Sequence, residues 1–119
     1  MTLEDLQPDA LAAFDAARAR AAELIDPGLL RAVRDRVTAT LEGTAGPSRD
    51  YEPGAREIDC LALVDQMLID VSSMSDETVA GANRHFAAGG LWDFVASAYL
   101  MEASIRLDIA SARLLGGRP

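Results

Sequence analysis

Apolar residues recur at intervals of three and four along most of the chain, which is the periodicity of amphipathic helices. Turn and capping residues divide this pattern into five predicted helices, over residues 8–24, 27–43, 55–71, 76–88 and 91–115. The chain shows neither an alternating strand pattern nor an internal repeat. The sequence therefore predicts an all-α fold in a single domain spanning residues 1–119.

Residues with clear local roles mark the ends of several predicted helices. Asp26 precedes Pro27, which is the arrangement expected of an N-cap followed by the first helical position. Ser75 precedes two acidic residues, which favour the positive end of a helix dipole. Glycine and proline exclude a helix before about Gly54, so residues 44–53 are predicted to be a connecting loop.

The last predicted helix has two apolar faces when its residues are projected at 100° each. The first face comprises Leu91, Phe94, Val95, Ala98, Met101, Ile105, Ile109 and Ala112. The second comprises Trp92, Ala96, Tyr99, Leu100, Ala103, Leu107, Ala110 and Leu114. Because a helix of a small monomer needs one buried face, we expect the other to pack on a second copy in a homo-oligomer. The alternative is a central helix surrounded by its own neighbours.

The charge of the chain argues against several classes of partner. The net charge is -8, and all eleven basic residues are arginines scattered among acidic ones. Nucleic-acid and membrane-surface binding need clustered basic residues, so neither partner is expected. No signal peptide and no membrane-spanning run is apparent, which predicts a cytoplasmic protein.

The cysteine and histidine content gives no metal or redox site. The single cysteine, Cys60, cannot form an internal disulfide, and no Cys and His set has the spacing of a zinc site. Cys60 falls within the apolar arc of the third predicted helix, where a cysteine behaves as a small core residue. We therefore predict no metal and no cofactor.

Several short motifs follow one another between residues 26 and 115. They are "DPGLLRAVRDRV" at 26–37, the helix start from Arg56 to Leu63, Ser75 to Glu77, His85 with Phe86, and Ser104 to Arg106. In this order they resemble the carboxymuconolactone decarboxylase and alkylhydroperoxidase D-like superfamily. The resemblance implies an orthogonal all-helical domain that assembles as dimers, trimers or hexamers, with residues 1–25 as an additional N-terminal helix.

The chain departs from the family pattern where redox members keep their thiols. Those members place a Cys-x-x-Cys pair and a nearby His behind the second helix, because peroxide reduction needs an attacking and a resolving thiol. The corresponding segment here, "GTAGPSRDYEPG" at 43–54, has no Cys or His and is too short for the helix that holds them. The resemblance thus implies a shortened, non-redox member that is not a thiol peroxidase.

Five residues form the candidate site. His85, the only histidine, and Glu102 are the candidate catalytic acids or bases, because both can move a proton. Trp92, Tyr99 and Arg106 are the candidate substrate-binding residues, since arginine binds carboxylates well. Each also has a structural interpretation: His85 as a hydrogen-bonded or solvated side chain, and Glu102 with Arg106 as an i, i+4 ion pair.

Two functions follow from these observations. The first is a non-redox protein that binds a small organic molecule or acts as an oligomeric accessory protein. The alternative is a cofactor-free lyase or isomerase for a carboxylated cyclic substrate, with Arg106 as the anchor and His85 or Glu102 as the proton carrier.

Overall fold

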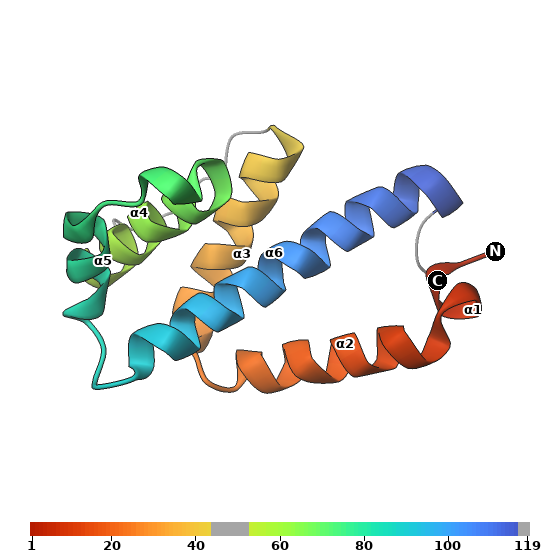
Figure 1. The fold of residues 1–119 in the computed structure, drawn as a ribbon, viewed down its shortest axis with the longest axis horizontal. Helices are drawn as coiled ribbons and strands as arrows, with labels where there is room; N and C mark the ends of the chain where they lie inside the picture. Colours follow the sequence, from red (N-terminus) through yellow and green to blue (C-terminus); the bar gives the residue numbers. More distant parts are fainter. Residues whose placement is uncertain (44–52, 117–119) are drawn as a thin grey trace.

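The computed structural model describes residues 1–43 and 53–116, and all regular structure in these residues is helical (Figure 1). The elements are α1 (Leu3–Leu6), α2 (Pro8–Ala22), α3 (Pro27–Glu42), α4 (Ala55–Ile69), the 3₁₀ helix η1 (Val71–Ser73), α5 (Asp76–Asn83) and α6 (Gly90–Leu115). The predicted all-α class is confirmed.

The predicted loop 44–53 lies outside the described residues except for Pro53. Within the described residues, none of the helices combines the length and apolar character needed to cross a membrane.

The capping residues act as their positions predicted. The Asp26 carboxylate accepts the N–H of Leu29 at 3.1 Å, and the Ser75 hydroxyl accepts the N–H of Thr78 at 3.2 Å. Gly43 ends α3 with a φ of 70°, a left-handed conformation that favours glycine. The boundaries of α3 and the start of α5 therefore follow from local capping chemistry.

Several helix boundaries differ from the prediction: α2 ends at Ala22 and α4 at Ile69, each two residues early, and there are two larger differences. The short helix α1 was not expected. It is held by a reciprocal capping box in which Thr2 and Asp5 each accept the other's backbone N–H. The fourth helix was predicted to continue to residue 88, but α5 ends at Asn83. In the turn that follows, Phe86 packs against Phe94 with ring centroids 5.5 Å apart, so tertiary packing replaces the last helical turn.

The core lies where α3, α4 and α6 meet. It comprises Ile25, Leu29, Ala32, Val33, Val37, Cys60, Leu61, Leu63, Val64, Met67, Ala82, Phe94, Ala98 and Met101. Cys60 is fully buried, as predicted for a core residue. Burial raises the pKa of its thiol to about 11, which leaves a thiolate fraction on the order of one in ten thousand at neutral pH.

Beyond the core, α6 continues as one half of an antiparallel two-helix arm with α2 (Figure 1). Three serines spaced seven residues apart along α6, Ser97, Ser104 and Ser111, are buried. The Ser97 hydroxyl donates to the carbonyl oxygen of Ala21 at 2.9 Å. Small side chains at this spacing let the two helix backbones approach closely. Because the three serines share one side of α6 and Ser97 bonds to α2, we infer that this side packs on α2.

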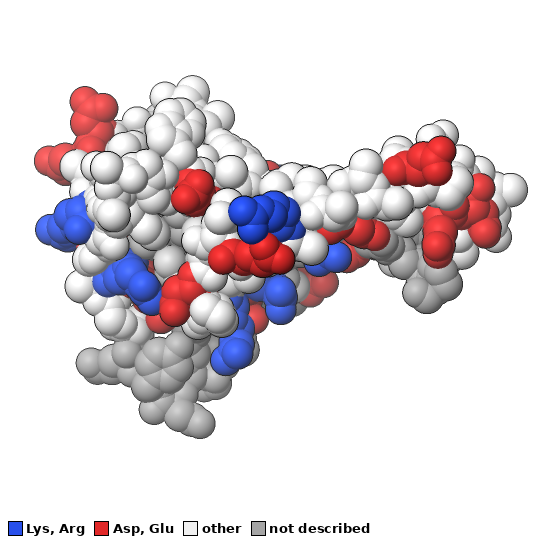
Figure 2. Space-filling model, turned by 90° about the horizontal axis from the view of Figure 1, so that it is seen from below, with Lys and Arg blue, Asp and Glu red and all other residues white. Residues whose placement is uncertain are grey.

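The surface of this arm is mostly acidic at its tip. Figure 2 shows Asp and Glu side chains there and, over the rest of the face in view, Arg side chains interspersed with acidic ones. The acidic residues of this region include Glu4 and Asp5 in α1 and Asp9 in α2. Among the described residues in view in Figure 2, the basic side chains form no continuous patch.

Candidate functional site

An apolar groove opens between α4, η1, α5 and α6, with a volume of about 300 Å³. Its lining is Leu63, Met67, Val71, Met74, Val79, Leu91, Trp92, Val95 and Tyr99. Among these nine side chains, only the Tyr99 hydroxyl and the Trp92 indole N–H can form conventional hydrogen bonds. The groove is therefore suited to contact apolar surface rather than to hold a charged group.

The groove has a buried floor and an exposed rim. Leu63 and Met67 lie one turn apart on α4 and are buried, so they form part of the core as well as the floor. Trp92, Val71 and Tyr99 on the rim are 79%, 56% and 40% exposed. Large apolar side chains that remain this exposed around a concave surface are typical of binding sites.

The helices set the direction of each wall. On α6, Leu91, Val95 and Tyr99 follow one another at four-residue intervals and so share one side of the helix. The opposite wall comes from the short segment after α4, which supplies Val71 and Met74. The groove thus depends on α4 ending at Ile69, two residues earlier than predicted.

The structure brings together only part of the predicted site. Trp92 and Tyr99 both line the groove, whereas Glu102 and Arg106 do not. Arg106 borders a separate hollow of about 300 Å³ with Leu41, Ile109 and Ala110. Its guanidinium lies 3.8 Å from the Glu102 carboxylate, and these side chains are 55% and 17% exposed. The predicted i, i+4 ion pair is present on the surface of α6.

His85 is bound to a carboxylate at another place on the molecule. Its Nε2 lies 2.6 Å from Oδ2 of Asp59 in α4, and the exposed Arg84 guanidinium donates to the same oxygen at 2.8 Å. The hydrogen bonds from His85 and then Arg84 lower the pKa of Asp59. His85 is not a lining residue of the groove. The expected hydrogen-bonded histidine is observed, and it ties the turn after α5 to α4.

Replacing Asp59 with asparagine tests whether these bonds to Asp59 stabilise the fold, because their contribution to stability should depend on pH. Because the pKa of Asp59 is lowered on folding, its charge stabilises the fold above the ordinary value near 3.8 and this contribution disappears as pH falls through the lower folded value. We expect Asp59→Asn to be less stable than wild type near neutral pH, with a difference that narrows below about pH 4. Urea denaturation at both pH values measures it.

The control for that experiment is Asp9→Asn, which changes an exposed acidic residue in the first turn of α2. It should change stability little at either pH. An Asp59→Asn difference that stays constant as the solution is acidified would contradict a charge-dependent contribution.

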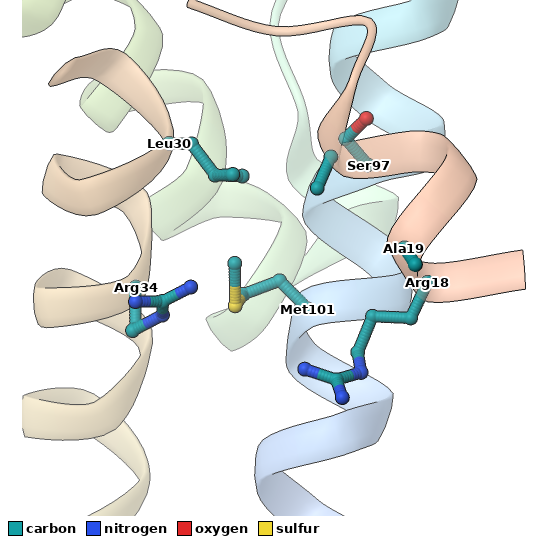
Figure 3. Close-up of a pocket in the computed structure, with 7 residues that line it drawn as sticks. Arg18, Ala19, Leu30, Arg34, Ser97 and Met101 are labelled. Atoms are coloured by element: carbon teal, nitrogen blue, oxygen red, sulfur yellow. The ribbon is translucent and has the colours of Figure 1, made fainter. Parts of the chain in front are cut away.

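A smaller hollow lies where α2, α3 and α6 meet. Its volume is about 110 Å³, and its lining includes Arg18, Arg34, Leu30, Ser97 and Met101. Figure 3 shows Met101 between the two arginines, which come from α2 and α3. This volume is below the range usual for organic ligands. Over residues 1–43 and 53–116, no group of three His, Cys, Asp or Glu side chains could hold a metal ion.

Trp92 and Tyr99 of the groove lining were identified from the sequence, but Val71 and Met74 were not. Val71 was expected to be the last residue of the third helix and Met74 to lie in the connection after it, so neither was identified as a site residue. The available indication was the apolar character of two residues in an otherwise polar connection between helices.

Comparisons of the chain with protein-family models, with curated proteins and with solved structures give no match.

Proposed function

We propose that this protein is a non-redox binding protein for a small, mainly apolar organic molecule, held in the groove between α4, η1, α5 and α6. The observation that supports it most directly is the composition of the lining, in which all nine side chains are aliphatic, aromatic or thioether. The volume of about 300 Å³ is at the lower end of the range for ligand pockets.

The chemistry of the lining limits the class of ligand. A carboxylate or a phosphate bound in this groove would lose its hydration shell without gaining a positively charged partner, so its binding would be unfavourable. An aromatic or alicyclic ring would instead contact Trp92 and the two methionines, Met67 and Met74, whose flexible thioethers adapt to irregular shapes. The Tyr99 hydroxyl could accept or donate one hydrogen bond to a single polar substituent.

The resemblance to the carboxymuconolactone decarboxylase superfamily is compatible with this proposal, because the segment that holds the thiol pair in redox members is the one that is shortened here. Low thiol reactivity is also expected from Cys60, since its thiol is buried and its pKa is raised. The acid and base alternative has weaker support, because neither His85 nor Glu102 lines the groove.

A fluorescent apolar probe tests the proposal. Titration with the uncharged probe N-phenyl-1-naphthylamine should show saturable binding to the folded wild-type protein. Val71→Trp places a bulky ring at the exposed rim of the groove and should weaken this binding about tenfold or more, since a filled pocket excludes the probe. Thermal unfolding should confirm that the variant remains folded.

Ile69→Trp is the matched control for this substitution. Ile69 is 75% exposed, lies two residues before Val71 and is not part of the groove lining. We expect it to bind the probe as the wild type does. Equal affinity of Val71→Trp and wild type, or no saturable binding at all, would contradict the proposed site.

A further inference from the structure

The second apolar face of α6 is only partly covered by the rest of the described chain. None of its eight residues, which are Trp92, Ala96, Tyr99, Leu100, Ala103, Leu107, Ala110 and Leu114, is buried. The first face, by contrast, includes Phe94, Ala98 and Met101, which are 1%, 3% and 6% exposed. The described chain therefore does not fully surround the helix: Leu100 and Leu107 are half-buried, and the other six residues of this face are exposed.

We infer that this face pairs antiparallel with the same face of α6 in a second copy of the chain, about a two-fold axis through Ala103. Six of the eight stripe residues occur symmetrically about that position, at 4, 7 and 11 residues on either side, while Leu100 has Arg106 at the matching distance. A symmetric dimer uses one surface patch twice, so such a patch must be complementary to itself under the two-fold rotation. The spacing of this stripe meets that requirement.

The antiparallel register matches side chains by size. The rotation places Trp92 opposite Leu114 of the second copy, which are 79% and 81% exposed and thus have the most to gain from being covered. Tyr99 comes opposite Leu107 of the second copy. Ala96 and Ala110 face each other between these pairs, as Ala103 does on the axis, and small residues permit close helix approach.

The charges beside the stripe favour the same register. Asp93 is ten residues before Ala103, and Arg113 is ten residues after it. The two-fold rotation brings Asp93 beside Arg113 of the second copy on each flank of the pair. A parallel pairing would instead place like charges beside one another, which is unfavourable.

The same helix already uses a comparable stripe within the chain. Ser97, Ser104 and Ser111 are spaced seven residues apart and are buried, and the Ser97 hydroxyl bonds to the Ala21 carbonyl of α2. Ala96, Ala103 and Ala110 have the same spacing and remain exposed. The α6 helix thus presents two parallel stripes of small residues, one occupied by α2 and the other available to a second copy.

The expected affinity follows from the size of the contact. The stripe is about 33 Å long, and a single pair of helices buries less than a standard protein interface. We therefore expect a dimer that dissociates in the micromolar range. This pairing does not depend on ligand binding, although Trp92 and Tyr99 also line the groove, so the second copy would lie along its rim.

Sedimentation equilibrium of the full chain over a range of concentrations tests the pairing. Wild type should show a reversible monomer and dimer, and Ala103→Arg should be monomeric throughout, because it places two guanidinium groups against each other on the axis. Ala112→Arg is the control on the same helix, since Ala112 is exposed about 180° from the stripe. It should dimerise like wild type.

A charge exchange distinguishes the antiparallel register from a general loss of fold. Asp93→Arg and Arg113→Asp should each weaken dimerisation, and the double variant should restore it to near the wild-type level, because opposite charges again meet across the interface. Circular dichroism should show the same helix content in all three.

The single tryptophan gives an independent optical measurement. Emission from Trp92 should shift to shorter wavelength as wild-type protein concentration rises and should not shift in Ala103→Arg, because covering an exposed indole removes it from water. A wild type that is monomeric at every concentration, or a double charge variant that dimerises no better than the single ones, would overturn the inference.

Discussion

Replacing Phe94 with alanine is expected to lower the free energy of unfolding by about 3–5 kcal/mol. Phe94 is 1% exposed and is the largest side chain among the fully buried residues. Its removal leaves a cavity between α6 and the rest of the core and also removes the ring contact with Phe86. Since the free energy of unfolding of a small domain is about 5–15 kcal/mol, this single change would remove a large part of the stability. Urea denaturation followed by circular dichroism measures it.

The control for this experiment is Ile69→Ala, which truncates an apolar side chain that is 75% exposed. It should change the free energy of unfolding by about 0.5 kcal/mol or less. Similar losses in both variants would show that Phe94 is not the central contact that its burial indicates.

Replacing Ser104 with leucine is expected to destabilise the protein by about 1–3 kcal/mol. Ser104 is 4% exposed and lies between Ser97, which bonds to α2, and Ser111 on the same side of α6. A branched side chain at this position must push the two helices apart or adopt a strained rotamer. The loss should appear as a lower urea midpoint.

Two further variants separate size from polarity at this contact. Ser104→Ala keeps the small volume and should cost about 1 kcal/mol or less. Ala112→Leu adds the same bulk to an exposed position of α6 and should be close to neutral. A Ser104→Leu variant as stable as wild type would mean that the α2 and α6 contact is loose.

The parts of the fold that depend on local chemistry could be predicted from the sequence. The caps at Asp26, Ser75 and Gly43 function in the structure as expected, because each bonds or bends within one helical turn. The end of α5 at Asn83 could not be predicted in this way. It depends on contacts of Phe86 and His85 with residues in other helices.

The candidate site likewise has a part that local periodicity predicts and a part that depends on tertiary packing. Trp92 and Tyr99 share a side of one helix, so helical periodicity brought them together, and both line the groove. The partner of His85 was not predicted, because Asp59 lies 26 residues away in a different helix. No spacing rule relates two positions whose proximity is set by how α4 packs on α5.

The contact between α2 and α6 also constrains the order in which the chain can fold during synthesis. The Ser97 hydroxyl bonds to the Ala21 carbonyl across 76 residues of sequence. At about 5–20 residues per second, Ala21 is added to the chain roughly 4–15 seconds before Ser97. The α3 and α4 helices are both made before α6 is complete. Because α2 can pack on α6 only after α6 has emerged, we expect the N-terminal helix to be among the last elements to reach its final position.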